Sequence, residues 1–141
     1  MIRLPPLEEI ARRWSEIEPL VRKATDETDG CYEPVHVMQE CLAGKRGFWL
    51  IEDDGKAIGI CVAGAEEFPT GKRVWRVVYI AGDRADEWYP ALMAEMDAQA
   101  RKWRCDEMTA NGRLGWERFS RRLGIELKPI TVCYGRKIGE M

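Results

Sequence analysis

The 141-residue sequence predicts an α/β (α+β) fold in a single domain that spans residues 1–141. Two apolar runs joined by Asp53-Asp54-Gly55 predict a β-hairpin, because Asp-Gly supplies the positive-φ residues of a tight turn. Alternating apolar residues from Arg73 to Ala81 predict a third long strand, and the next apolar residues recur at helical spacing. Strands and helices that interleave in this way, without a repeat or a linker, indicate one mixed domain with its own core.

The N-terminal third is predicted to be mostly helical. Ile2-Arg3-Leu4 predicts a short first strand. Apolar residues recur at helical spacing from Leu7 to Thr25, and we expect a break just before Pro19, because proline removes a backbone donor. A second helix is expected over Glu33–Leu42. Its buried stripe is expected to contain Val35, Met38 and Leu42.

The C-terminal half continues the pattern of strand, helix, strand, helix. A turn is expected at Gly82–Asp86, followed by a long helix over Glu87–Trp103. The buried residues of that helix recur every three or four positions and are Leu92, Met96, Ala100 and Trp103. The strand Glu107–Ala110 and the arginine-rich helix Arg113–Leu123 follow. Two apolar runs are predicted to close the chain as strands: Ile125–Leu127 and Ile130–Tyr134.

The composition excludes several classes of protein. Its 45% hydrophobic and 33% charged residues are typical of a globular chain. No apolar run approaches the roughly 18–20 residues that span a bilayer, and the first residues do not form a signal peptide, so we expect a cytoplasmic protein without a membrane partner. Five cysteines without a C-x-x-C pair, and His36 as the single histidine, predict no metal site. Cys61 and Cys133 are expected to be buried, reduced thiols.

Charge is distributed unevenly along the chain. Residues 1–100 carry 12 basic and 19 acidic side chains, a net charge of −7, whereas residues 101–141 carry 10 and 5, a net charge of +5. On a helix, the spacing of three and four places Arg118, Arg121 and Arg122 on one face, with Arg113 one turn earlier. Such a face could bind nucleic-acid phosphates. Because the whole chain is acidic and has no nucleic-acid motif, pairing with acidic residues of the same fold or of a neighbouring subunit is the favoured interpretation.

The predicted element order resembles that of the GNAT (acyl-CoA N-acyltransferase) superfamily along essentially the whole chain. Its most specific segment, Arg113 to Ile125, is similar to the family helix that ends in leucine, glycine and an apolar residue. The resemblance implies a mixed, mostly antiparallel central sheet of six to seven strands flanked by about four helices. It also implies acetyl-CoA as the cofactor and an amine as the acyl acceptor.

The turn that would hold the cofactor departs from the family pattern. In active members it reads Q/R-x-x-G-x-G/A, and its backbone amides bind the pyrophosphate at a helix N-terminus. Matching the family's leucine pair to residues 92–93 places its arginine on Arg84 and its glycines on Glu87 and Tyr89. Glu87 puts a carboxylate beside the pyrophosphate, Tyr89 puts a ring where bare backbone is needed, and Pro90 removes a donor.

An active member of the family would use several further residues of this chain. The cofactor would be bound by the end of the third long strand and the following turn, at Ile80, Arg84, Ala85, Asp86, Glu87 and Trp88. Glu66 or Glu67 would deprotonate the amine through water, although both are more simply interpreted as solvated strand-end residues. The family's tyrosine, which protonates the leaving thiolate, falls on Ser120, and serine is a poor acid for that step.

The segment from Gly112 to Arg118 resembles a Gly-Arg-x-Gly-Trp-x-Arg sequence in divergent GNAT-like proteins of tailed phages. Some of those are internal virion components that keep the fold without evident acyl transfer. We therefore predict a phage-encoded structural or interaction protein without acyltransferase activity or cofactor, present in the host cytoplasm or in the virion. Its partner would be a second copy or a virion component. Partner-binding aromatic candidates are Trp88, Tyr89 and Trp116, although packing within the domain is the favoured interpretation of all three. An active N-acetyltransferase and a nucleic-acid-binding protein remain the alternatives.

Overall fold

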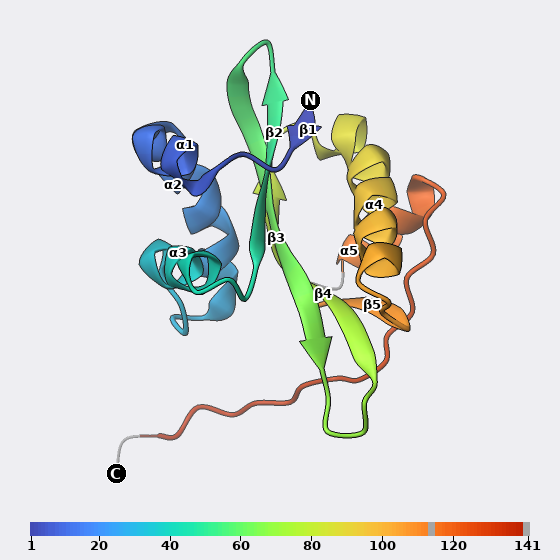
Figure 1. Ribbon diagram of the computed structural model, residues 1–141. Helices are drawn as coiled ribbons and strands as arrows, with labels where there is room; N and C mark the ends of the chain where they lie inside the picture. The colour runs from blue at the N-terminus through green and yellow to red at the C-terminus, as the bar shows by residue number, and fades with distance from the viewer. Residues whose placement is uncertain (113–114, 140–141) are drawn as a thin grey trace. The chain divides into compact units, whose positions relative to one another are not determined.

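A computed structural model describes residues 1–112 and 115–139 of the chain (Figure 1). The chain forms two compact units, Met1–Asn111 and Gly112–Met141. No helix in the described ranges is long and apolar enough to cross a membrane.

A five-stranded sheet organises the first unit. Its strands follow the order of the sequence: β1 (Ile2–Arg3), β2 (Gly47–Asp53), β3 (Lys56–Glu67), β4 (Arg73–Gly82) and β5 (Glu107–Ala110). Neighbouring strands are antiparallel except β4 and β5, which are parallel. The prediction of a mixed, mostly antiparallel sheet is therefore confirmed. The described residues contain five strands, however, fewer than the six to seven that the resemblance implied.

Five α-helices and one 3₁₀-helix complete the described elements. They are α1 (Leu7–Arg12), α2 (Trp14–Thr25), η1 (Asp26–Thr28), α3 (Pro34–Leu42), α4 (Ala85–Lys102) and α5 (Gly115–Arg122). In the first unit, α1, α2 and α3 cover one face of the sheet and α4 covers the other (Figure 1). Each face of the sheet consequently has its own apolar layer.

The layer under α1–α3 contains the larger core. Its buried residues include Ile10, Ile17, Val21, Val37, Phe48, Leu50, Ile60, Val62 and Tyr79. The buried stripe predicted for α3 was wrong, because Val35 and Leu42 are exposed and the buried residues are Pro34, Val37 and Cys41. The true stripe keeps the helical spacing but uses a cysteine, which behaves as a small hydrophobe when it is buried.

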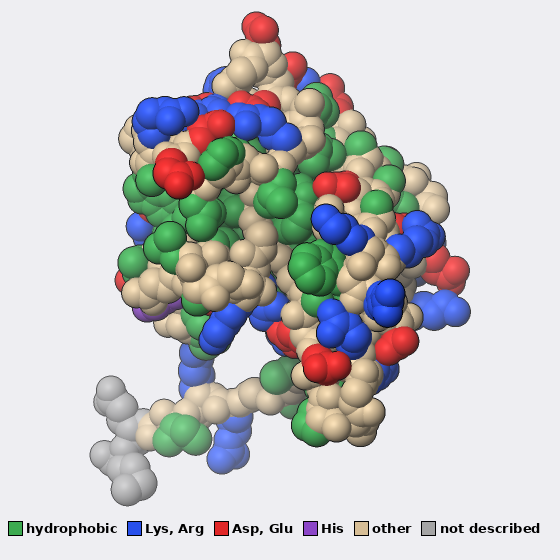
Figure 2. All heavy atoms as spheres, viewed as in Figure 1, with side chains coloured by type: hydrophobic (Ala, Val, Ile, Leu, Met, Phe, Trp, Pro, Cys, Tyr) green, Lys and Arg blue, Asp and Glu red, His purple; other side chains and the backbone are tan. Residues whose placement is uncertain are grey.

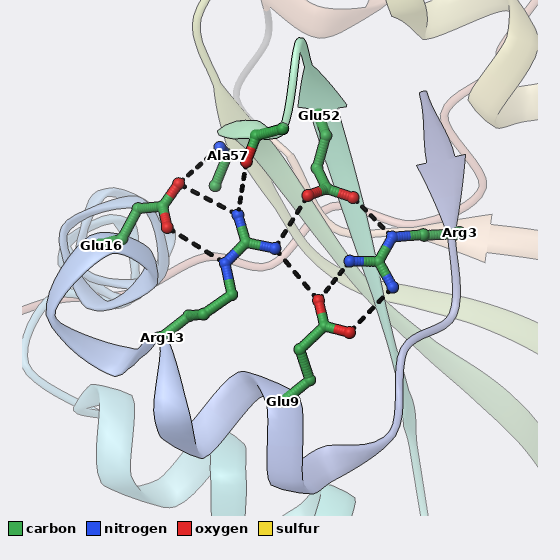
Figure 3. Close-up of polar contacts among 7 residues, drawn as sticks. Arg3, Glu9, Arg13, Glu16, Glu52 and Ala57 are labelled. Carbon is green, nitrogen blue, oxygen red and sulfur yellow. Dashed lines mark hydrogen bonds and ion pairs between the residues drawn. The ribbon is translucent and has the colours of Figure 1, made fainter.

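The break between α1 and α2 lies at Arg13, because the guanidinium of Arg13 uses all five of its N–H groups there (Figure 3). They donate to Glu16 at 3.1 Å through two nitrogens, to Glu9 at 3.0 Å, to Glu52 at 2.8 Å and to the Gly55 carbonyl at 2.9 Å. These bonds attach the two helices to β2 and to the hairpin. The break predicted just before Pro19 was wrong, and α2 runs through that residue.

Arg3 extends this network to the first strand. Its guanidinium donates to Glu9 and, at 2.5 Å, to Glu52 (Figure 3). These hydrogen bonds from Arg3 are the main reason that the pKa of Glu9 is lowered to about 2 and that of Glu52 falls below its usual value. The network therefore joins β1, α1, α2 and β2 through charge-assisted hydrogen bonds.

The layer under α4 is rich in aromatic and sulfur-containing side chains. Trp49 and Trp75 meet edge to face with ring centroids 6.0 Å apart, and the Trp75 indole donates to Met96 Sδ at 3.3 Å. Cys61 is fully buried beside the same sulfur, which confirms its predicted place. Trp103 was predicted to be buried, but it lies at the end of α4 with 49% of its surface exposed.

The second unit consists of α5 and the segment that follows it. Gly124, with φ +81°, ends α5, and the Ile125 N–H donates back to the Ser120 carbonyl at 3.0 Å. The predicted strands Ile125–Leu127 and Ile130–Tyr134 are absent from the described residues, and Cys133 is exposed rather than buried. A strand forms only where another strand satisfies its backbone and covers its alternate side chains, and sequence alone does not supply that partner.

Candidate functional site

An irregularity in β4 marks the position where an acyl-CoA fold would bind its cofactor. Val62 pairs with Tyr79 and Ala63 with Val77, so Val78 is an extra residue, a β-bulge. β5 pairs with β4 only from Val74 to Val77. Among the described residues, the β4 edge from Val78 to Gly82 has no strand partner on the side away from β3.

The turn after β4 is short and lies tightly against β3. It contains Asp83 and Arg84, because β4 ends at Gly82 and α4 begins at Ala85. The Asp83 N–H donates to the Ile58 carbonyl at 2.8 Å. Gly82 has a φ of +154°, and a Cβ there would lie 2.4 Å from the Ile58 carbonyl oxygen. Only glycine fits this close approach of two backbones. We call the segment Gly82–Trp88 the β4–α4 turn.

Trp88 fills the space beside this turn. Its indole N–H donates to the Asp83 carbonyl at 2.8 Å. Its ring lies so close to Gly59 and Gly82 that a Cβ on either would come within 3.0 or 3.1 Å of it. Trp88 and Tyr89 are both buried, so the prediction that they form a partner surface was wrong, and they pack within the domain.

Arg84 is already paired with carboxylates. It begins α4 in the left-handed conformation, with φ 58°, and its guanidinium binds Asp53 at 2.6 Å and also Glu87. The hydrogen bonds to Glu87 and then to Asp53 raise the pKa of Arg84 above its usual value. On the other side of the turn, Lys23 Nζ lies 3.0 Å from Asp83 Oδ1. The arginine that the resemblance assigns to a pyrophosphate therefore holds the hairpin and the helix together.

The electrostatics of the turn oppose the binding of an anion. Lys23 and Arg84 carry two positive charges against four carboxylates, a net charge of −2. The four are Asp53, Asp83, Asp86 and Glu87. Asp86 and Glu87 lie in the first turn of α4, where carboxylates already complement the positive end of the helix dipole. A pyrophosphate at Ala85–Glu87 would be repelled by them.

The two candidate bases lie toward the other end of β3. Glu66 pairs with Val74, seven residues along β3 from the Gly59–Gly82 pair, or roughly 23 Å. Its carboxylate is held by Arg46 at 2.6 Å and Arg76 at 3.7 Å. A general base needs a free lone pair directed at its substrate, which this pairing does not favour.

Glu67 differs from its neighbour. It is exposed, and its nearest cation is Arg73 at 3.8 Å. This agrees with the interpretation of Glu67 as a solvated strand-end residue, whereas Glu66 is held by two arginines instead.

The candidates of the second unit lie on α5. Ser120 is buried, and Trp116 meets Phe119 edge to face at 5.4 Å. Arg121 binds Glu117 at 3.0 Å, and the Arg122 guanidinium lies over the Phe119 ring at 5.8 Å. Arg118 is exposed, and Arg113 lies outside the described residues. The arginines at 121 and 122 thus have partners within the helix.

A shallow hollow of about 410 Å³ lies between α2 and α3. Its lining consists of Trp14, Glu18, Arg22, Glu33, Pro34, Val35 and Met38. Figure 2 shows apolar side chains gathered on this side of the first unit, with charged groups at their border. Its rim is closed by the Glu18–Arg22 ion pair. No group of three or more metal-ligating side chains occurs in residues 1–112 and 115–139.

Sequence reasoning missed three contributors to the β4–α4 turn. Asp53 and Lys23 are 31 and 60 residues from the groups they bind, and no local pattern predicts such pairs. The bulge at Val78 did leave a signal, because Val77 and Val78 are consecutive apolar residues in a strand that otherwise alternates.

Comparisons with known proteins give the fold a name. No family model and no curated protein sequence matches the chain. Solved structures do match over nearly the whole length of both chains. A probable acetyltransferase is 16% identical, with 100% of this chain and 99% of that chain covered and a TM-score of 0.72.

Two further structures give the same result. A ribosomal-protein-alanine N-acetyltransferase from Brucella melitensis is 15% identical, with coverages of 98% and 99% and a TM-score of 0.70. A GNAT family acetyltransferase from Staphylococcus aureus is 13% identical, with coverages of 98% and 98% and a TM-score of 0.64. The chain therefore has the fold of the GNAT acetyltransferases.

Proposed function

We propose that this chain is a GNAT-fold interaction protein that does not bind coenzyme A at its β4–α4 turn and carries out no acyl transfer. The observation that supports this most directly is the state of Arg84, which is bound to Asp53 and Glu87 on the residues that would meet the pyrophosphate. The buried Trp88 beside it adds a steric argument.

The proposal follows from what binding would require. A pyrophosphate at this turn would have to displace Arg84 from two carboxylates and leave those carboxylates beside the new anion. It would also need exposed backbone amides, whereas the Asp83 amide already donates to β3. Each unpaired like-charge contact in a partly desolvated site opposes binding.

A titration of acetyl-CoA tests the proposal. Isothermal calorimetry and thermal denaturation should show no binding and no rise in Tm at millimolar cofactor. Binding in the micromolar range would overturn it, because a ligand at a hundredfold its Kd stabilises the fold by about 2.7 kcal/mol, which raises Tm by several degrees.

A double variant isolates the electrostatic contribution. Asp53→Asn with Glu87→Gln releases Arg84 and changes the charge around the turn from −2 to 0. We expect weak coenzyme A binding to appear in this variant and not in the wild type. If the variant binds no better, the packing of Trp88 excludes the cofactor without help from charge.

The proposed setting is a tailed phage, with a virion component or a second copy as the partner. Support comes from the sequence segment Gly112 to Arg118 and its resemblance to divergent phage proteins. Genes for portal, capsid or tail proteins beside this one, and the protein itself in purified particles by mass spectrometry, are the expected findings. Its absence from such particles would contradict the virion role.

N-acetyl transfer from acetyl-CoA to an amine is the second candidate function. It is favoured by the bulge at Val78 and the unpaired β4 edge from there to Gly82, where the Ile80 backbone would bind the pantetheine arm. The structural neighbours are also acetyltransferases by name. Release of free thiol from acetyl-CoA in the presence of a panel of primary amines would establish this function and exclude the first.

Nucleic-acid binding through α5 is a third and weaker candidate. Its support is the arginine set, of which Arg118, Arg121 and Arg122 are described. A gel-retardation assay at low and moderate salt tests it, since phosphate contacts weaken steeply as salt rises. Absence of binding at low salt removes this candidate.

A further inference from the structure

The segment that follows α5 has the side-chain pattern of a strand without being in a sheet. From Ile130 to Tyr134 the residues alternate between large apolar and smaller side chains. Ile130 is 69% exposed, Val132 62% and Tyr134 89%. β-branched and aromatic residues in this alternation are typical of a strand with one covered face. Three large apolar side chains in a row of alternate positions indicate that this face has a cover. We call Ile130–Tyr134 the C-terminal arm.

Charge indicates what kind of surface covers the arm. Lys128 precedes it and Arg136 and Lys137 follow it, and all three are exposed. Residues 112–141 carry 7 basic and 3 acidic side chains, a net charge of +4. Residues 1–111 carry 15 basic and 21 acidic side chains, a net charge of −6. The first unit of another copy is therefore an oppositely charged partner for the arm.

The first unit also has an open sheet edge. β5 contains four residues and pairs with β4 along one side. Among the described residues, no strand pairs with its other side. Such an edge presents unpaired N–H and C=O groups that an extended segment can bind. Glu107 at the start of β5 adds a negative charge there, which matches the basic residues that flank the arm.

We propose that the C-terminal arm adds as a strand to the β5 edge of a second copy of this chain. The backbone of the arm bonds to β5, and its three apolar side chains are covered by the partner. Exchange in both directions gives a two-fold symmetric dimer, in which each copy supplies one arm and one edge. This assembly goes beyond the proposed function, because it does not depend on whether the β4–α4 turn binds coenzyme A.

The test combines mass and amide protection on the full chain. Size-exclusion chromatography with light scattering should give the mass of two chains, and hydrogen exchange should show slow amides in the arm and in β5. Val132→Asp should raise the dimer dissociation constant by about tenfold or more, because it removes a buried valine. Thr131→Asp is the matched control, since it adds the same charge on the opposite side of the arm and should leave the dimer intact.

The outcomes separate the alternatives. A monomer with fast-exchanging arm amides would overturn the proposal, because the arm would then bind nothing. A monomer with protected arm amides would also overturn it, because the arm would then pair with its own chain. A dimer that Val132→Asp and Thr131→Asp weaken equally, or not at all, would place the interface elsewhere. All of these variants alter exposed residues, so the fold of the first unit is retained in each of them.

Discussion

Trp88→Ala should lower the unfolding free energy by about 4 kcal/mol, near the middle of the range for large buried aromatics. Trp88 is fully buried, and part of its ring lies against Gly59 and Gly82. These glycines have no side chains that could move into the space that the ring leaves. The substitution also removes the 2.8 Å hydrogen bond to the Asp83 carbonyl. Because domains of this size are stable by about 5–15 kcal/mol, the variant should be close to its unfolding threshold.

The assay is urea unfolding followed by circular dichroism, with two comparison variants. Trp88→Phe keeps one ring but loses the indole N–H, so it should cost about 1–2 kcal/mol. Trp103→Ala is the matched control, because it removes the same residue type from the same helix at a site that is 49% exposed. It should cost less than about 1 kcal/mol. If the two alanine variants differ by less than about 1 kcal/mol, Trp88 does not hold the turn closed.

Three further predictions concern the charged network and the turn. Arg13→Lys should cost about 2–3 kcal/mol in urea unfolding, because an ammonium cannot reach the five acceptors that the guanidinium binds. Arg3 lowers the pKa of Glu9 to about 2, so stability from this carboxylate is present above pH 4.5 and is lost as pH falls toward about 2. Arg3→Ala should therefore show a smaller fall in urea midpoint between neutral pH and about pH 3. Gly82→Ala should cost more than about 3 kcal/mol, whereas Gly71→Ala, with positive φ but open space around it, should cost about 1 kcal/mol in thermal or urea unfolding. A loss below about 1 kcal/mol for Arg13→Lys, an unchanged acid slope, or equal costs for the two glycines would contradict the respective prediction.

Local chemistry explains which elements could be predicted. Asp54 and Gly55 have φ angles of 51° and 78°, as the hairpin between β2 and β3 requires. The strand Glu107–Ala110 has the predicted bounds, and Gly44 and Gly124 end their helices in the left-handed conformation. In each case the deciding residues are neighbours in the sequence, so their pattern carries the structural information.

The features that could not be predicted depend on residues far apart in the sequence. The break at Arg13 is fixed by Glu52 and by the Gly55 carbonyl, 39 and 42 residues away. The engagement of Arg84 depends on Asp53, which the sequence presents only as part of a hairpin turn. The strands expected after α5 are a third case, because the apolar alternation was present but no partner edge was specified.

The β4–α4 turn shows why a cofactor-binding fold can be retained without its cofactor. A phosphate-binding turn needs bare backbone, unpaired amides and an arginine that is free to bind, and all three reduce the stability of the unliganded protein. Here the corresponding groups are paired: the Asp83 amide with β3, Arg84 with two carboxylates, and the backbone with the indole of Trp88. The two apolar layers and the Arg13 network involve none of these residues. The same side chains that oppose an anion therefore stabilise the junction of β4 and α4, so substitutions that reopen the turn should lower the unfolding free energy before they restore any binding.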